Sequence, residues 1–580
     1  MTVLKKLFSS IREYKTVTYL TLVFILGEAI IETLIPTKTA DLINEVQSGS
    51  DMSDIIKVGL ILTVMAIASL ACGALAAFTC AKAATGFSKN LRHDMFQNVQ
   101  KYSFQNIDKF SSSSLVTRMT TDINNIQMAF MMMIRMGLRS PLMFILSTIA
   151  AFKMGGSLAM AFVVVIPILI VGLAIIGKKA MPAFRSVFKK YDRLNESIEE
   201  NVRAMRVVKG FSREEYEKEK FGTAAEDIRA DFTKAERIVA MNQPLMSLCM
   251  YFDMVFILSV GSKMAIVDKT VNIGQVSAMI TYGVQILMSL MFLSMIYVMV
   301  TMSAESMKRI YEVLVEEPTI HNPAQPVKEV ADGSIDFEGV NFKYSAEAER
   351  FALSDINLHI PSGATVGIIG GTGSSKSTLV QLIPRLYDVT QGTLKVGGTD
   401  VKKYDLRTLR DSVAMVLQKN ELFSGTIKEN LRWGNANATD AEIKEACQLA
   451  QASEFVESFP DAYDTHFEQG GTNVSGGQKQ RLCIARALLK KPKILILDDS
   501  TSAVDTKTDA LIRQGFRTFI PETTKIIIAQ RISSVQDADM IIVMNNGTVE
   551  DVGTHEELMA RSEIYRDVYE QQNHGNGGEE

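Results

Sequence analysis

A glycine-rich stretch in the second half of the chain carries the clearest chemical signal in the sequence. The stretch reads, in order, Gly370, Gly371, Thr372, Gly373, Ser374, Ser375, Lys376, Ser377 and Thr378. It follows the apolar run 366–369, and a buried strand that enters such a turn and opens a helix is the layout of a phosphate-binding loop. Lys376 would reach the terminal phosphates, and the Ser377 hydroxyl would hold Mg²⁺. Ser375 departs from the pattern, because the motif places glycine before the lysine.

A second run has the composition of a strand that ends in metal-binding carboxylates. Residues 494–497 are apolar, and Asp498 and Asp499 follow them directly. A carboxylate at the end of a buried strand can hold Mg²⁺, directly or through water, beside a phosphate loop. Such a strand is weak evidence alone, but its position after the phosphate loop predicts a nucleotide-binding site that takes Mg²⁺.

These residues lie in a region whose pattern alternates between strands and helices. Short apolar runs at 364–370, 493–499 and 524–530 have the β-branched composition of buried parallel strands. The sequence therefore predicts an α/β nucleotide-binding domain of the phosphate-loop type over residues 333–571. A proline-containing linker at 318–332 precedes it, and a polar, glycine-rich tail at 572–580 follows, which we expect to be disordered.

The first part of the chain, residues 1–317, is predicted to be an all-α membrane domain. About 20 apolar residues are needed to cross ~30 Å of hydrocarbon, and six stretches approach or exceed this length: 17–36, 55–81, 128–152, 158–176, 245–266 and 276–302. A buried core helix could explain one of them, but six in succession favour a bilayer. Lys and Arg concentrate at the N-terminus and in 82–122 and 178–237, so both termini are predicted to be cytoplasmic.

Five ionisable side chains lie within these apolar stretches. Each costs roughly 2.5–3.5 kcal/mol at mid-bilayer, so they are expected to face the interior of the helix bundle or a wet cavity. Either they line a transport pathway or they form ion pairs between helices. They are Glu28, Glu32, Arg135, Arg139 and Asp253.

Composition narrows the classes of partner. The 580 residues carry a formal net charge of −4 with a pI near 6.0, which gives no reason to expect a nucleic acid partner. The five cysteines show no metal-ligand spacing, and we expect them to be small buried residues in a reducing compartment.

Residues 474–481, between the two nucleotide motifs, carry the most specific pattern. They read Val-Ser-Gly-Gly-Gln-Lys-Gln-Arg, which resembles the signature motif of ABC ATPases. With Tyr344, Gln418, the turn 502–505 and the six spans, nearly the whole chain resembles an exporter-type ABC half-transporter. In that family two chains pair, and two ATP molecules lie between head-to-tail nucleotide-binding domains. Each ATP contacts the phosphate loop of one chain and the signature motif of the other.

The resemblance implies roles for further residues. Tyr344 would stack on adenine, Gln418 would sense Mg²⁺ and the attacking water, and Asp505 would connect the site to the other chain. Short turns near 108–114 and 211–216 would dock the membrane helices on the nucleotide-binding domains. The γ-phosphate bound by the partner chain would meet the signature residues Ser475, Gly476, Gly477 and Gln478.

Two positions break the hydrolytic pattern of the family. Asp499 stands where a glutamate acts as general base; it is one methylene shorter, about 1.5 Å, and a misplacement near 1 Å can cost on the order of 10²-fold in rate. Gln530 stands where a histidine contacts the γ-phosphate, and it cannot carry charge. Together these two changes predict a site that binds ATP but hydrolyses it poorly, while the intact signature motif serves a partner; Ser375 is a third departure, which either crowds the phosphates or only narrows the loop's freedom.

This combination resembles the degenerate-site subunit of heterodimeric bacterial multidrug exporters. The resemblance implies a multi-pass protein of the bacterial plasma membrane that exports hydrophobic or amphipathic compounds with a second ABC half-transporter chain. A lipid or peptide exporter of the same architecture, a homodimer, and a membrane-bound nucleotide sensor without turnover stay open. A soluble ABC ATPase is disfavoured by the six spans.

Overall fold

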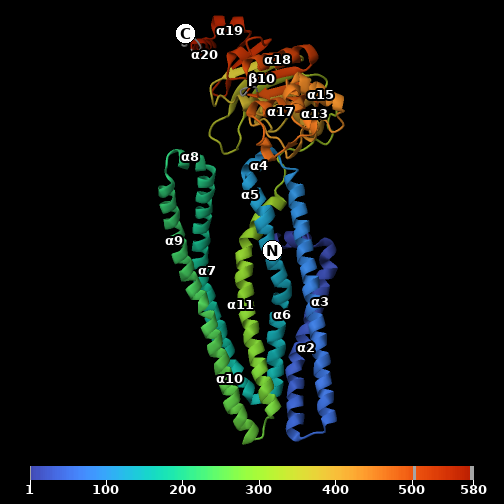
Figure 1. Ribbon diagram of the computed structural model, residues 1–580, viewed down its shortest axis with the longest axis vertical. Helices are drawn as coiled ribbons and strands as arrows, with labels where there is room; N and C mark the ends of the chain where they lie inside the picture. Colours follow the sequence, from blue (N-terminus) through green and yellow to red (C-terminus); the bar gives the residue numbers. More distant parts are fainter. Residues whose placement is uncertain (1, 501–503, 575–580) are drawn as a thin grey trace. The chain divides into compact units, whose positions relative to one another are not determined.

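The computed structural model describes residues 2–500 and 504–574, which fold into two compact units (Figure 1). One unit combines the chain up to residue 101 with residues 111–316, and it corresponds to the predicted membrane domain. The other combines residues 102–110 with residues from 317 onward, and it corresponds to the predicted nucleotide-binding domain. The predicted fold class, a helical membrane domain followed by an α/β domain, is therefore confirmed.

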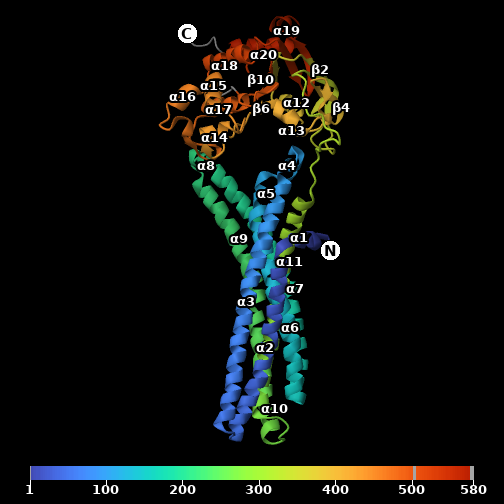
Figure 2. The same ribbon diagram turned by 90° about the vertical axis from the view of Figure 1, so that its right-hand side faces the viewer.

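Long helices form the membrane unit, and each of the six predicted spans falls on one of them. The six are α2 (Lys15–Ser48), α3 (Met52–Val99), α6 (Ile123–Gly155), α7 (Met160–Arg203), α10 (Asn242–Ile266) and α11 (Ile273–Val315). The remaining α-helices described in this unit are α1 (Thr2–Ser9), α5 (Ser112–Thr117), α8 (Met205–Gly210) and α9 (Glu214–Ala240). Figure 1 and Figure 2 both show α7 and α9 running side by side up to α8.

By length and composition, five helical stretches of the described chain are able to cross a membrane. One of them, Ser112–Phe184, contains both α6 and the first half of α7, because only the short turn Gly156–Ala159 separates these helices. The six predicted spans and the five stretches therefore describe the same helices.

Two of the ionisable side chains within the spans form an ion pair. The Arg139 Nη2 atom on α6 donates to both carboxylate oxygens of Glu32 on α2, at 2.8 and 2.7 Å. The Glu28 carboxylate lies 3.6 Å from the Arg139 Nε atom. Asp253 is buried on α10, where Gly283 of α11 leaves room for its carboxylate, since a Cβ there would lie 2.1 Å from an Asp253 oxygen. The ion-pair interpretation thus holds for Arg139 and its two carboxylate neighbours.

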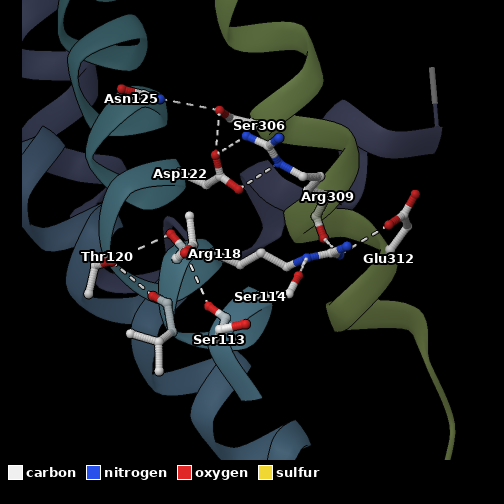
Figure 3. Close-up of polar contacts among 11 residues, drawn as sticks. Ser113, Ser114, Arg118, Thr120, Asp122, Asn125, Ser306, Arg309 and Glu312 are labelled. Carbon is white, nitrogen blue, oxygen red and sulfur yellow. Dashed lines mark hydrogen bonds and ion pairs between the residues drawn. The ribbon is translucent and has the colours of Figure 1, made fainter. Parts of the chain in front are cut away.

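A π-helical turn, Arg118–Asp122, precedes α6 and is bonded to the end of α11 (Figure 3). The Asp122 carboxylate, whose side chain is 1% exposed, accepts hydrogen bonds from Ser306 Oγ at 2.8 Å and from Arg309 Nε at 2.8 Å. Arg118 donates back to the Arg309 carbonyl at 2.6 Å. Asp122 is buried while Arg309 is 42% exposed, so solvent screens part of this ion pair; its several hydrogen bonds still connect the turn to α11.

The nucleotide-binding unit is built on a six-stranded sheet in the order β12-β11-β3-β10-β9-β6. All neighbouring strands are parallel except the β11–β12 pair. The strands are β3 (Thr365–Gly370), β6 (Val413–Val416), β9 (Ile494–Asp498), β10 (Thr524–Ile528), β11 (Met540–Asn545) and β12 (Thr548–Gly553). Three of them, β3, β9 and β10, lie in the predicted apolar runs, and β9 and β10 are buried at every position.

A second, antiparallel sheet has the strand order β2-β1-β4-β5. It packs against the first sheet, and apolar residues of both sheets form one buried cluster. Its strands are β1 (Ile335–Phe342), β2 (Leu353–Ile360), β4 (Gln391–Val396) and β5 (Thr399–Asp400). A two-stranded sheet joins β7 (Gly425–Thr426) and β8 (His466–Phe467).

Helices complete the nucleotide-binding unit. They are α12 (Lys376–Leu382), α13 (Leu406–Ser412), α14 (Ile427–Leu431), α15 (Asp440–Leu449), α16 (Ser453–Glu457), α17 (Gly476–Leu488), α18 (Thr506–Phe519), α19 (His555–Arg561) and α20 (Glu563–His574). Helix α20 extends three residues into the predicted tail 572–580, so residues 572–574 are helical rather than disordered. Residues 575–580 of that tail lie outside the described part of the chain.

Helix α4 (Phe104–Phe110) belongs to the nucleotide-binding unit, although it lies more than 200 residues earlier in the sequence. The Tyr387 hydroxyl donates to Asp108 at 2.7 Å, and Phe104 packs edge-on against the Tyr387 ring at 5.9 Å. The Asn106 amide donates to the Glu317 carbonyl at 3.0 Å. Part of the turn predicted near 108–114 to dock on the nucleotide-binding domain therefore does pack there.

Candidate nucleotide-binding site

The phosphate loop connects β3 to α12 and has the backbone that its glycines predict. At Gly370, φ is +156°, and a Cβ would lie 2.2 Å from the Met544 carbonyl oxygen, so only glycine fits beside β11. Helix α12 begins at Lys376, within the stretch 370–378, so its first N–H groups point toward the glycine-rich turn before it. This is the anion-binding arrangement that the sequence predicts.

Ser375 occupies the left-handed region of backbone conformation, with φ +69° and ψ 25°. Such a conformation costs a residue with a Cβ about 1–2 kcal/mol, which glycine avoids. The family's glycine at this position therefore has a backbone reason. Ser375, which replaces that glycine, therefore has a strained backbone inside the phosphate loop.

The Lys376 side chain folds back over the loop. Its Nζ atom donates to the carbonyl oxygens of Gly370 at 2.8 Å and Gly371 at 2.9 Å. Burial lowers the pKa of Lys376, while the nearby carboxylates of Asp498 and Asp499 act in the opposite direction. An ammonium held at the mouth of the loop is placed to meet phosphate oxygens.

Asp498 and Ser377 form the predicted magnesium pair. The Ser377 hydroxyl donates to an Asp498 carboxylate oxygen at 3.0 Å, across the end of β9 and the start of α12. Asp498 is 4% exposed, and burial raises its pKa, while the Ser377 hydrogen bond opposes this shift. A carboxylate and a hydroxyl are hard oxygen ligands of the kind that Mg²⁺ takes together with phosphate and water, so these two residues fit the ion.

The Asp499 carboxylate lies between two side-chain amides. Its Oδ2 atom accepts from Gln530 Nε2 at 2.7 Å and, over a longer 3.4 Å, from Gln418 Nε2. The Asp499 backbone is also left-handed, with φ +49°. The two positions that break the hydrolytic pattern, Asp499 and Gln530, are therefore direct partners.

One cleft of about 510 Å³ collects most of the predicted site. Residues 370–378, Gln418, Asp498, Asp499 and Gln530 all line it. These residues come from four separate segments of the chain, which meet at the carboxyl ends of the parallel strands. Ligands of open α/β sheets bind at this edge.

Tyr344 lies beside the cleft, just after β1. Its hydroxyl is hydrogen-bonded to Thr378 Oγ1 at 2.8 Å, and its ring packs edge-on against Phe342 and Tyr387 at 4.9 and 5.2 Å. The residue is 42% exposed. A ring anchored to the phosphate-loop helix with part of its surface open is suited to the predicted stacking on adenine.

The signature residues Ser475 to Gln478 form the N-terminus of α17, outside the described lining of that cleft. Ser475 is the N-cap and makes a reciprocal capping box: Gln478 N donates to Ser475 Oγ at 3.3 Å, and Ser475 N donates to Gln478 Oε1 at 2.9 Å. Gly476 and Gly477 occupy the first two helical positions, where their free N–H groups and the helix dipole favour an anion.

The turn 502–505 is described only at its end. Residues 502 and 503 lie outside the described residues. Asp505 caps α18, because its carboxylate accepts from Thr508 N at 2.9 Å, and this hydrogen bond lowers the pKa of Asp505. Its predicted role toward the other chain stays a prediction.

Comparison with known proteins decides the family. The family described as ABC transporter transmembrane region matches residues 18–290, and the family described as ABC transporter matches residues 353–502. An uncharacterized ABC transporter ATP-binding protein of Bacillus subtilis, YfiB, is 34% identical over 98% of this chain and 98% of its own length. The chain belongs to the ABC transporter family.

Two further relatives and a solved structure agree with this assignment. An uncharacterized ABC transporter ATP-binding protein of Mycobacterium tuberculosis is 32% identical over 96% of both chains. A protein of Mycobacterium bovis named fatty acid ABC transporter ATP-binding/permease protein is 32% identical over 78% of this chain and 71% of its own. The structure of a bacterial Atm1-family ABC exporter with ATP bound, 22% identical, superposes with a TM-score of 0.82 over 97% of this chain and 98% of that one, which shows the fold.

As an ABC exporter, the chain is an ATP-driven transporter embedded in a lipid bilayer. Its nucleotide-binding unit binds ATP, normally with Mg²⁺, and ATP hydrolysis is coupled to transport. Asp498 and Ser377 are the residues that would hold Mg²⁺, and the ion would supply positive charge to neutralise the phosphates. Lys376 and the loop N–H groups would bind and orient the phosphates.

Sequence reasoning missed the contribution of α20 to this ABC site. Val568 lines the cleft, and Gln572 forms hydrogen bonds with the backbone on either side of residue 531. A signal was present, since Tyr565, Val568 and Tyr569 follow a helical spacing. The polar composition after residue 571 concealed the last turn of this helix.

Proposed function

We propose that this chain is one half of a heterodimeric exporter and that its own phosphate loop hosts the weaker of two ATP sites. That site would hold ATP and stabilise the closed pair of nucleotide-binding domains. Hydrolysis at the site built on the partner's phosphate loop would reset the transporter.

The contact between Asp499 and Gln530 is the observation that carries this proposal. A general base must reach the attacking water, and the Asp499 carboxylate is a methylene shorter than a glutamate and engaged by the Gln530 amide at 2.7 Å. A neutral amide donates a hydrogen bond but supplies no positive charge to a γ-phosphate. Both features favour binding of ATP over its hydrolysis.

The signature helix supports a partner chain. Its capping box is complete and its two glycines are in place at the start of α17, although the phosphate-loop site of the same chain has lost its base and histidine. In a head-to-tail pair, Ser475 to Gln478 would serve the other chain's ATP. A partner with glutamate and histidine at the positions of Asp499 and Gln530 would then hydrolyse it.

We propose hydrophobic or amphipathic compounds as the substrates, with multidrug efflux as the leading case. The chain would lie in the bacterial plasma membrane with both termini in the cytoplasm. The mycobacterial relative named as a fatty acid transporter favours a second candidate, export of lipids by the same architecture. Long apolar helices suit either class of cargo.

The ATPase rate of the chain alone, and again with the half-transporter that co-purifies with it, tests the proposal. The chain alone is expected to show little activity, and addition of the partner is expected to raise the rate on the order of 10²-fold. Full activity of a homodimer of this chain would overturn the degenerate-site argument. A partner that lacks glutamate and histidine at the matching positions would overturn the division of labour.

A further inference from the structure

In α20, the last helix of the described residues, the Gln572 side chain bonds to the backbone of residues 530–532 beside the nucleotide site. Gln572 of α20 accepts a hydrogen bond from Ile532 N at 2.8 Å and donates one to the Gln530 carbonyl at 2.7 Å. Both polar atoms of the amide are therefore used, and they hold the backbone on both sides of residue 531. An amide that makes both bonds fixes the position and the orientation of that segment.

This contact leads directly into the cleft. The Gln530 side chain, whose backbone Gln572 holds, donates to Asp499 Oδ2 at 2.7 Å. Val568, one turn earlier on α20, lines the same cleft as the phosphate loop. Helix α20 therefore contacts the nucleotide site in two ways. The Val568 side chain lines the cleft, and the Gln572 amide holds the backbone of residues 530–532, a contact that we call the clamp.

Helix α20 has an anchor that does not involve Gln572. Tyr565 is fully buried, and its hydroxyl is hydrogen-bonded to His555 Nδ1 at 2.7 Å. The loss of one amide near the end of the helix would therefore leave the helix attached. Substitution of the Gln572 side chain therefore tests the clamp while helix α20 stays in place.

We propose that Gln572 is a positioning residue for the γ-phosphate contact of this chain's ATP site. By fixing the backbone of residues 530–532, it would hold the Gln530 amide toward the terminal phosphate, and the C-terminal helix would thereby set how well the site distinguishes ATP from ADP. This inference rests on the role of Gln530 in the proposed function.

The test uses the full-length chain in its native assembly and the variant Gln572→Ala, with Gln571→Ala as the matched control because Gln571 is exposed on the same helix. Photoaffinity labelling with 8-azido-ATP and 8-azido-ADP is read on peptides of this chain, so the signal reports its own site. We expect Gln572→Ala to weaken ATP labelling about three- to tenfold and to leave ADP labelling unchanged. Equal loss for both nucleotides would indicate a merely structural role and would overturn the proposal.

Two further variants separate the inference from the proposed function. Gln530→Ala should lose ATP preference by itself, and adding Gln572→Ala to it should cause no further loss, because the clamp would have nothing left to position. If Gln530→Ala has no effect, the role of Gln530 in the proposed function fails. If it has an effect and Gln572→Ala has none, only the clamp fails.

The variant Gln572→Glu sharpens the result. A carboxylate can still accept from Ile532 N but cannot donate to the Gln530 carbonyl. We expect ATP labelling to fall at least as far as in Gln572→Ala, and an ATP preference equal to that of the unmodified chain would contradict the inference.

Discussion

Two regions of the nucleotide-binding unit are the predicted phosphate contacts, the phosphate-loop cleft and the signature helix, and they differ in backbone strain. In the phosphate-loop cleft, both Ser375 and Asp499 have left-handed backbones, with φ +69° and +49°. At the signature helix, the N-cap Ser475 has an ordinary extended backbone, with φ −69° and ψ 159°. Residues in sparsely populated conformations cost of order 1–3 kcal/mol each, so the cleft is held in place by its surroundings, whereas the signature forms from local sequence.

The chemistry of the two regions differs in the same direction. The cleft carries Asp499, Gln530 and Ser375 where the family motif predicts glutamate, histidine and glycine, and Gln530 bonds to Asp499 within it. The signature helix keeps its capping box and its glycines. Under the proposed function, this contrast separates the site that the domain would use itself from the surface that it would offer to another chain.

The largest effect is expected from Ser475→Ala. Loss of one preorganised donor or cap at a γ-phosphate should lower the ATPase rate of the assembled transporter on the order of 10²-fold. Thr554→Ala is the matched control, because Thr554 caps α19 with the same kind of capping box away from the nucleotide site. Each substitution should lower helix stability by about 1 kcal/mol, so a similar ATPase loss in both would show that the signature acts only through stability.

A smaller effect, this time a gain in activity, is expected when the glutamate and histidine of the family motif are introduced into the cleft. Asp499→Glu together with Gln530→His supplies a longer carboxylate and a chargeable ring, and it should raise turnover of the chain measured without a partner by about ten- to 100-fold. Single-turnover hydrolysis measures this directly. The single variant Asp499→Glu is the control for the base alone, and no gain in either variant would indicate that the cleft is inactive for another reason.

The smallest effect is expected from Ser375→Gly. Glycine accepts the left-handed backbone, and after its larger unfolded-state entropy is counted the net stabilisation should be about 1 kcal/mol or less. Thermal unfolding of the chain can be followed by Trp433, its single tryptophan, which lies in the nucleotide-binding unit. The control is Ser374→Gly, one residue earlier at a position without positive φ, which should not raise the thermal stability of the chain. An equal rise in stability in this control would contradict the explanation by left-handed backbone strain at Ser375.

Part of this site could be predicted from the sequence because its signals are local. The loop 370–378 and the β9 carboxylate are each read within one strand and one turn, and the structure brings them into one cleft. The bond between Gln530 and Asp499 could not be predicted, since it depends on the spacing of neighbouring strands. The hydrogen bonds of Gln572 could not be predicted either, because the polar composition after residue 571 gives no sign that α20 continues there.

Helix α4 has a consequence for the biosynthesis of the protein. Asp108 bonds to Tyr387, a residue 279 positions later in the chain, and translation proceeds at roughly 5–20 residues per second. A ribosome would therefore need on the order of tens of seconds to make the surface that receives α4. During that interval Phe104 and its neighbours would lack the aromatic residues they pack against. Helix α4 can therefore take its final packing only after residues more than 270 positions later in the chain have been made.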